Sequence, residues 1–250
     1  MTMRLLLINP NTSAGVTQKL DGVARDAAAS GTELVSATAT RGVPYIATRA
    51  DAAIGAVVVL EMLSARDGSF DAAIIGAFGD PGLGGARELF SVPVIGLAEA
   101  GMLSACMLGR NFSIVTFSRA LVPWYEECVK WHGLHERCSS IRSLNEGFAT
   151  LESVQNEKEQ RLIDLANRTA DEDGADVIVL GGAPLSGLAH VIRDRVAVPL
   201  VDCVVAAVKQ SEALIALKTR SPKAGTYRQP SAKSSVGLDP SLSRMLAGSS

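Results

Sequence analysis

The sequence is poor in two features that nucleic-acid-binding proteins use. Aromatic residues make up only 4% of its 250 residues, and the formal net charge is −2. Such a chain offers neither a strongly positive surface for phosphates nor many rings on which bases could stack. We therefore expect no nucleic acid among its partners.

Long hydrophobic runs are also missing. No apolar run reaches the roughly 18–20 residues that a transmembrane helix requires. The first apolar run, Leu5-Leu6-Leu7-Ile8, is too short for the core of a signal peptide and is more typical of a strand. With 47% hydrophobic residues the chain has ample material for a globular core. We expect a cytoplasmic protein with no membrane partner.

Cysteines are few and do not form a recognisable metal or redox motif. The four are Cys106, Cys128, Cys138 and Cys203, and no two stand in a Cys-x-x-Cys pair or in a zinc-like spacing with histidine. The sequence also lacks a Gly-x-Gly-x-x-Gly motif and a P-loop lysine. We therefore expect no metal and no cofactor.

Strand-like and helix-like segments alternate along the chain, which is typical of parallel sheets covered by helices. The expected strands are Leu5–Ile8, Glu33–Ala39, Ala72–Ile75, Val94–Gly96, Phe112–Thr116, Ile141–Leu144, Val177–Leu180 and Leu200–Val201. The expected helices are Ala14–Ala29, Ala50–Ser64, Gly84–Phe90, Glu99–Leu108, Ala120–Trp131, Glu157–Asp173, Ala189–Val196 and Val204–Leu217. After Lys218, Ser, Pro, Gly and basic residues dominate, which predicts an extended, mobile tail with a short helix over Leu238–Leu246. Packing of that tail on a neighbouring subunit is the alternative.

Two stretches repeat the same order of residue types. Asp71–Ala77 and Asp176–Gly182 each run from Asp through an aliphatic strand to glycine and a small residue, and a Val-Pro step follows each of them. Two related α/β lobes explain the repeat, with a ligand site where their strand ends face each other. The alternative is that separate strand–helix units carry glycine at this point independently.

Three loops that follow expected strands carry the candidate chemistry. In Asn9-Pro10-Asn11-Thr12-Ser13, Thr12 or Ser13 can cap a helix, and the two Asn amides offer donors and acceptors for a cyclic amide. A turn with a good helix cap is the alternative interpretation of this segment. The other two loops are Gly-rich and run over Ile75–Leu83 and Val179–Leu188.

Together these three loops resemble the aspartate/glutamate/hydantoin racemase superfamily, and the resemblance spans about residues 3 to 217. In its racemases each Gly-rich loop carries a cysteine, and the pair moves a proton across a Cα. The corresponding positions here are Ala77 and Gly182, which implies a divergent branch that lacks both cysteines. The resemblance implies an α/β fold of two pseudo-symmetric parallel-sheet lobes with the active site in the cleft between them. The predicted lobes are 1–97 with 204–217, and 98–203, followed by the tail 218–250.

The resemblance also indicates where a small-molecule substrate binds. The predicted substrate-binding residues are Asn9, Asn11, Ala77, Phe78, Thr116, Phe117, Gly182, Ala183 and Pro184. Backbone N–H groups of Phe78 and Ala183 could stabilise an oxyanion, whereas Pro184 has no N–H and shapes its loop. In the family, hydroxyl residues at the strand end occupied by Thr116 and Ser118 bind a carboxylate or carbonyl. Helix capping by Ser118 is the alternative.

Racemisation by two bases needs proton carriers on opposite faces of the Cα, which Ala77 and Gly182 cannot provide. We therefore predict Asp80, Glu99 and Ser118 as catalytic residues, with a water held by one of them attacking a ring carbon. The alternatives are that Asp80 caps a helix and that Glu99 occupies a first helical turn for electrostatic reasons. A displaced thiol at Cys203 or Cys106 is a further alternative, although free cysteines are mostly buried.

The predicted function is an enzyme that acts on a hydantoin- or thiohydantoin-like cyclic amide by hydrolytic or lyase chemistry. One alternative is a racemase of hydantoin, allantoin or an amino acid that uses other residues or has lost its cysteines. A second alternative is a binding protein without catalysis. We expect a homo-oligomer in each case.

Overall fold

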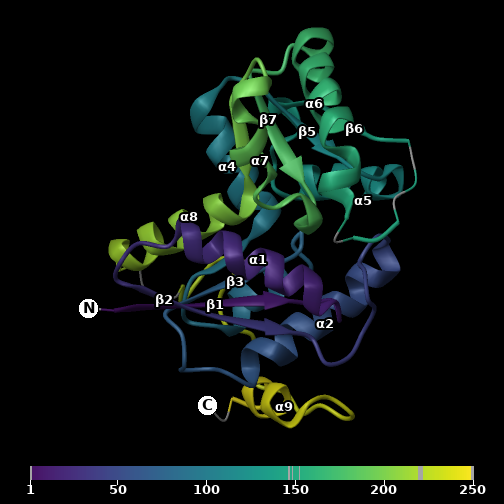
Figure 1. Ribbon diagram of the computed structural model, residues 1–250. Helices are drawn as coiled ribbons and strands as arrows, with labels where there is room; N and C mark the ends of the chain where they lie inside the picture. The colour runs from purple at the N-terminus through teal and green to yellow at the C-terminus, as the bar shows by residue number, and fades with distance from the viewer. Residues whose placement is uncertain (1, 146, 148, 152, 219–221, 249–250) are drawn as a thin grey trace.

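Two four-stranded parallel sheets form the two lobes of the computed structural model, which describes residues 2–145, 147, 149–151, 153–218 and 222–248 (Figure 1). The first sheet contains β1 (Met3–Asn9), β2 (Thr32–Thr38), β3 (Ala72–Ile75) and β4 (Val94–Gly96), in the order β2-β1-β3-β4. The second contains β5 (Phe112–Thr116), β6 (Cys138–Ser143), β7 (Val177–Gly181) and β8 (Leu200–Asp202), in the order β6-β5-β7-β8. The two orders are equivalent, so the predicted α/β fold with two related lobes is confirmed.

Helices connect the parallel strands and cover both faces of each sheet. The helices are α1 (Ala14–Ala27), α2 (Arg49–Ser64), α3 (Leu83–Leu89), α4 (Leu97–Leu108), α5 (Val122–Trp131), α6 (Val154–Asp173), α7 (Leu188–Ile192), α8 (Cys203–Leu217) and α9 (Pro240–Leu246). Short 3-10 helices lie at Arg119–Leu121, His135–Arg137, Ala183–Leu185 and Arg193–Arg195. Every residue of β3, β5 and β7 is buried, as expected for strands covered on both faces.

The strand register places the loops of interest at one edge of each sheet. Ile8 of β1 pairs with Ile75 of β3, so the segment after Asn9 and the loop after β3 leave the first sheet side by side. In the second sheet Thr116 of β5 pairs with Gly181 of β7. The side chain of Ser13 accepts a hydrogen bond from the Val16 N–H and caps α1.

Two expected helices are divided in the structure. The helix expected over Ala120–Trp131 consists of the 3-10 helix Arg119–Leu121 followed by α5. The segment expected to be helical over Ala189–Val196 forms α7 only to Ile192 and then continues as the 3-10 helix Arg193–Arg195. Helix α8 contacts helices α1 and α4 and also strands β3 and β4 of the first sheet. Figure 1 shows α8 beside α1. The predicted division of the chain into lobes at residues 97 and 203 stays a prediction.

The expectation of a mobile tail is wrong for its last helix. Helix α9 packs against α2 of the first lobe, and its Leu242 and Met245 are buried (Figure 1). These residues stand three apart on one helical face, and the Asp239 side chain caps the helix by accepting from the Ser241 and Leu242 N–H groups. Residues 219–221 and 249–250 of the predicted tail lie outside the described residues.

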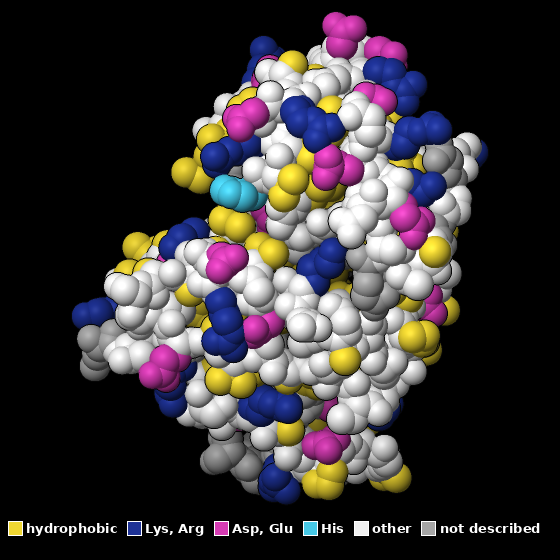
Figure 2. All heavy atoms as spheres, viewed as in Figure 1, with side chains coloured by type: hydrophobic (Ala, Val, Ile, Leu, Met, Phe, Trp, Pro, Cys, Tyr) yellow, Lys and Arg dark blue, Asp and Glu magenta, His cyan; other side chains and the backbone are white. Residues whose placement is uncertain are grey.

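Charged side chains of both signs are mixed on the face of the molecule that Figure 2 shows, in agreement with the small net charge of the chain. Within the described part of the chain, no helix has the length and apolar character needed to cross a membrane.

Candidate functional site

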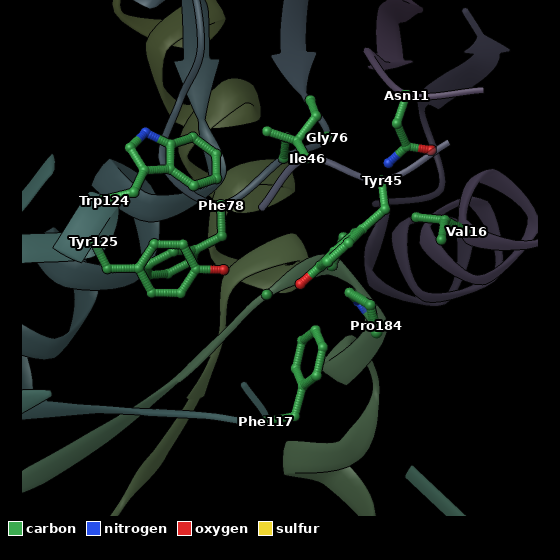
Figure 3. Close-up of a pocket in the computed structure, with 13 residues that line it drawn as sticks. Asn11, Val16, Tyr45, Ile46, Gly76, Phe78, Phe117, Trp124, Tyr125 and Pro184 are labelled. Carbon is green, nitrogen blue, oxygen red and sulfur yellow. The ribbon is translucent and has the colours of Figure 1, made fainter. Parts of the chain in front are cut away.

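A small cavity lies where the carboxyl ends of the two sheets face each other (Figure 3). It is lined by Asn11, Val16, Tyr45, Ile46, Gly76, Ala77 and Phe78 of the first lobe and by Phe117, Trp124, Tyr125, Gly182, Ala183 and Pro184 of the second. Its volume of about 20 Å³ is enough for roughly one or two water molecules.

Aromatic rings dominate the cavity wall. The chain contains six Phe, three Tyr and two Trp, and five of these residues line this one cavity. The ring centroids of Phe78 and Tyr125 are 4.5 Å apart, and those of Trp124 and Tyr125 are 5.6 Å apart. Tyr45 and Phe117 come from different lobes and lie 6.3 Å apart, so this pair spans the cleft.

The few polar groups of the cavity are uncharged. None of its described lining residues has a charged side chain, and the polar ones are Asn11, Tyr45 and Tyr125. Burial, with the charge of Asp51, raises the pKa of Tyr45 above its ordinary value. Burial likewise raises the pKa of Tyr125 well above 10, although the neighbouring Thr116 hydroxyl acts in the opposite direction. Both phenols therefore stay protonated near neutral pH and can donate hydrogen bonds.

The first loop is held by the amide of Asn9. Its Nδ2 donates to the Asn11 Oδ1, the Ser13 carbonyl and the Thr17 hydroxyl, each at 3.0 Å. The Asn11 Oδ1 also accepts from the Ser13 N–H at 2.9 Å. These bonds fix the Asn11 side chain, and Figure 3 shows its amide nitrogen directed toward Tyr45. Asn9 therefore positions Asn11 and does not itself line the cavity.

Gly182 and Phe117 fit together at the base of the second loop. Gly182 has φ = +120°, a conformation that residues with a side chain rarely adopt. A Cβ added there would lie 2.8 Å from Cε1 of Phe117, whose side chain is buried. The ring of Phe117 therefore occupies the space into which a side chain at position 182 would extend.

A buried ion-pair network lies beside the first Gly-rich loop. The Asp80 carboxylate accepts hydrogen bonds from the Ala98 and Glu99 N–H groups at 2.9 Å each, and from His132 Nε2 at 3.0 Å. Glu99 pairs with Arg87 and lies 3.5 Å from His132 Nδ1. Asp80 therefore joins its loop to the start of α4 and to the end of α5.

The pKa values in this network follow from the pairing. Burial alone would lower the pKa of His132, but the hydrogen bonds and charges of Asp80 and Glu99 raise it from 6.5 to about 9. Burial alone would raise the pKa of Glu99, but His132 and Arg87 lower it to about 2. The Glu99 carboxylate is therefore ionised and the His132 imidazole is protonated at neutral pH, and these opposite charges stabilise each other.

Metal-ligand types also meet in this network. Asp80, Cys128 and His132 place one potential ligand atom each within 4.8 Å of one another. The Asp80 carboxylate bonds directly to the imidazole, and burial raises the pKa of the Cys128 thiol well above 9. A metal would have to displace this ion pair and deprotonate the thiol, so these residues fit a structural role better than a metal site.

Comparison with known proteins agrees with this geometry. The sequence profile of the family described as Asp/Glu/Hydantoin racemase matches residues 5–211. The chain belongs to this family. It is 34% identical over 233 residues to the hydantoin racemase of Paenarthrobacter aurescens, an alignment that covers 92% of this chain and 99% of the relative.

Two solved racemase structures share the fold over nearly the whole chain. The allantoin racemase from Klebsiella pneumoniae is 37% identical with a TM-score of 0.90, and the comparison covers 96% of this chain and 99% of that structure. The allantoin racemase from Pseudomonas fluorescens is 36% identical with a TM-score of 0.87, covering 94% of this chain and 100% of that structure. The family and the two-lobe fold inferred from the three loops are therefore confirmed.

The structure brings most of the predicted substrate-binding residues to one place. Those that line the cavity are Asn11, Ala77, Phe78, Phe117, Gly182, Ala183 and Pro184. Asn9 and Thr116 are buried behind the wall and do not line it. The sequence analysis missed the lining residues Tyr45, Trp124 and Tyr125. The sequence did contain a signal for two of them: the chain has only eleven aromatic residues, and two of these stand side by side at positions 124 and 125.

None of the predicted catalytic residues Asp80, Glu99 and Ser118 lines the cavity, and their catalytic role stays a prediction. The two carboxylates bond to other groups of the protein: Asp80 accepts from the Ala98 and Glu99 N–H groups and pairs with His132, and Glu99 pairs with Arg87. Ser118 precedes the 3-10 helix Arg119–Leu121 and makes no capping hydrogen bond with its side chain. The alternative interpretation of Asp80 as a helix cap agrees with the structure. The helix that it caps is α4, because its carboxylate accepts from the Ala98 and Glu99 N–H groups.

The alternative of a displaced thiol also finds no support in the geometry. Neither Cys203 nor Cys106 lines the cavity. The Cys203 thiol is buried, donates to the Leu180 carbonyl at 3.4 Å, and has a pKa that burial raises well above 9.

The raised pKa of His132 predicts a pH-dependent stability. Because its pKa is higher in the folded chain than 6.5, protonated His132 stabilises the fold fully below about pH 6.5. This contribution is lost as the pH rises toward about 9. We expect the free energy of unfolding, measured by urea titration, to fall across that interval. The substitution His132→Gln should remove most of the fall, whereas His135→Gln, at an exposed histidine, should leave it unchanged.

Parallel pH curves for the wild-type chain and His132→Gln would contradict this account of the network.

The low pKa of Glu99 gives a second check at acid pH. Its contribution is present above about pH 4.5 and is lost as the pH falls toward about 2.

The fit of Gly182 to Phe117 predicts an energetic coupling between the two positions. Gly182→Ala should lower the free energy of unfolding by about 1–3 kcal/mol for the backbone alone, with the contact to Phe117 adding to this. Phe117→Leu in the same chain should recover the contact part, as a double-mutant cycle in urea can measure. Gly174→Ala is the control, because Gly174 has φ = +65° but open space around its Cβ position. Equal effects of Phe117→Leu on both alanine variants would refute the coupling.

Proposed function

We propose that this chain recognises a hydantoin-type ring, a small uncharged cyclic amide, in the cavity between its lobes. We also propose that it does not racemise that ring by a pair of thiols. The names of its relatives, hydantoin racemase and allantoin racemase, support the class of ligand. The position of the cavity at the carboxyl ends of both sheets supports the place of binding.

The observation that carries the proposal is the absence of charge among the described residues of the cavity wall. A bound carboxylate would lie against aromatic rings with no cation beside it, and burial of an unpaired charge is costly. A cyclic amide needs only hydrogen-bonding groups, which Asn11, Tyr45 and Tyr125 provide. The aromatic rings supply apolar surface for the ring and for a substituent on it. The cavity therefore favours a cyclic amide over a free amino acid.

The same wall argues against proton transfer by two bases. Positions 77 and 182 carry Ala and Gly, and the Phe117 ring fills the space beside Gly182. The two phenols have raised pKa values and are poor bases near neutral pH. Because Phe117 and Gly182 fit each other, we infer a site rebuilt around these residues and not a racemase site from which two side chains were simply removed.

The hydrolytic or lyase chemistry favoured by the sequence analysis has less support than recognition of a racemase-type ligand. It relied on Asp80, Glu99 or the Ser118 hydroxyl to hold a water; the two carboxylates are engaged in the ion-pair network, and Ser118 does not line the cavity. The relatives are named as racemases, and nothing in the comparisons favours hydrolysis.

Proton NMR of 5-benzylhydantoin and allantoin with the protein in D2O tests the proposal. We expect the ligand resonances to broaden, while deuterium enters C5 no faster than in buffer alone. Ala77→Leu is the control variant, because the larger side chain fills the cavity and should abolish the broadening while the fold, checked by circular dichroism, is retained.

Each other outcome points to a different function. Faster deuterium incorporation at C5 with an intact ring would show an isomerase that uses other groups. Ring-opened or desulfurised products, the latter from a 2-thiohydantoin, would show hydrolytic chemistry. If the protein broadened the resonances of none of these rings, the proposed recognition of hydantoins would be contradicted.

A further inference from the structure

The hydroxyl group of Tyr45 is buried in the cavity and has no hydrogen-bond partner among the described residues of the protein. Among the described residues, the buried side-chain oxygens in this state are those of Tyr45 and Thr116. Thr116 lies behind the wall beside Tyr125, whereas Tyr45 lines the cavity. Figure 3 shows its oxygen directed into the space bounded by Phe117, Tyr125 and Pro184. An unpaired buried hydroxyl destabilises a fold, so its presence needs an explanation.

The loop that carries Tyr45 is fixed by other contacts. The Val43 carbonyl accepts from the Thr12 N–H at 3.0 Å, which joins this loop to the first site loop. On the other side of Tyr45, the Ala47 and Thr48 N–H groups donate to the Asp51 carboxylate at 3.1 and 3.0 Å. The backbone therefore holds Tyr45 at the cavity without help from its hydroxyl, which is free for a ligand.

The chemistry of the missing partner follows from that hydroxyl. Because the phenol stays protonated near neutral pH, its strongest contribution is as a donor to an acceptor oxygen. A carboxylate acceptor would be buried among rings without a cation, whereas an amide carbonyl is neutral. The ring face of Tyr45, which lies near Phe117 across the cleft, remains available for contact with the ligand.

We propose that Tyr45 is a specificity-determining residue of this site, whose hydroxyl donates to a carbonyl oxygen of the bound cyclic amide. The inference rests on the proposed recognition of a hydantoin-type ring. The new element is that the Tyr45 phenol selects the carbonyl of the ligand. Tyr45 lies in the loop between β2 and α2, outside the three loop motifs of the sequence analysis.

The substitution Tyr45→Phe tests this, with affinity for 5-benzylhydantoin measured by titration calorimetry. We expect the Kd to rise about tenfold, because the bound carbonyl loses its donor. The urea midpoint of the ligand-free variant should stay at or above that of the wild-type chain, since an unpaired hydroxyl has been removed. Tyr227→Phe, at the tyrosine outside the cavity, should change neither the affinity nor the preference described next.

A second ligand separates recognition from a general packing effect. The thiocarbonyl sulfur of a 2-thiohydantoin or a 4-thiohydantoin is a weaker acceptor than oxygen. The wild-type chain should prefer the oxygen ligand over at least one of the two sulfur analogues, and Tyr45→Phe should reduce that preference. A merely structural role would alter both affinities equally.

The possible failures are distinguishable. If the wild-type chain binds no hydantoin, the proposed function fails and the role of Tyr45 fails with it. If the wild-type chain binds but Tyr45→Phe has the same affinity and the same preference, only the inference about Tyr45 is overturned. A clear loss of stability in ligand-free Tyr45→Phe would also overturn it, because the hydroxyl would then have a partner within the protein.

Discussion

The Asp80 carboxylate is the group on which the arrangement of the site depends. Asp80 itself has φ = +52°, a backbone conformation that Asp tolerates better than most residues, and it lies in the first Gly-rich loop. Its oxygens hold the N-terminus of α4 and the imidazole of His132 at the end of α5. Helix α5 carries Trp124 and Tyr125, so this carboxylate links the loop that presents Ala77 and Phe78 to the aromatic wall opposite.

Charge and aromatic surface are separated within the site. The ionised groups pair with one another beside the loop, where they fix geometry, and the cavity receives only uncharged groups. The carboxylates of Asp80 and Glu99, which the sequence suggested as catalytic groups, pair with groups of the protein beside the cavity. This separation means that the cavity can discriminate only by shape, apolar contact and hydrogen bonding, as expected for a site that takes a neutral ring.

The sequence predicts the features of this fold that depend on local patterns. Strand β3 has the expected limits, Ala72 to Ile75, because a short aliphatic run bounded by turn residues is a local signal. The pairing of Asp80 with His132, 52 residues away, has no such signal, and neither has the docking of α9 through Leu242 and Met245. Tyr45 was missed because its loop does not follow the strand-end pattern, and its place in the cavity results from tertiary packing.

The proposed binding of an uncharged ring at this site can be measured directly. Titration calorimetry with 5-benzylhydantoin and its ring-opened product, N-carbamoylphenylalanine, tests it most directly, because the two ligands share the benzyl and urea groups and the second adds a carboxylate. The account predicts that the ring binds and that the open-chain acid binds at least about 100-fold more weakly, since its charge would be buried without a cation. Equal or tighter binding of the acid would contradict the account.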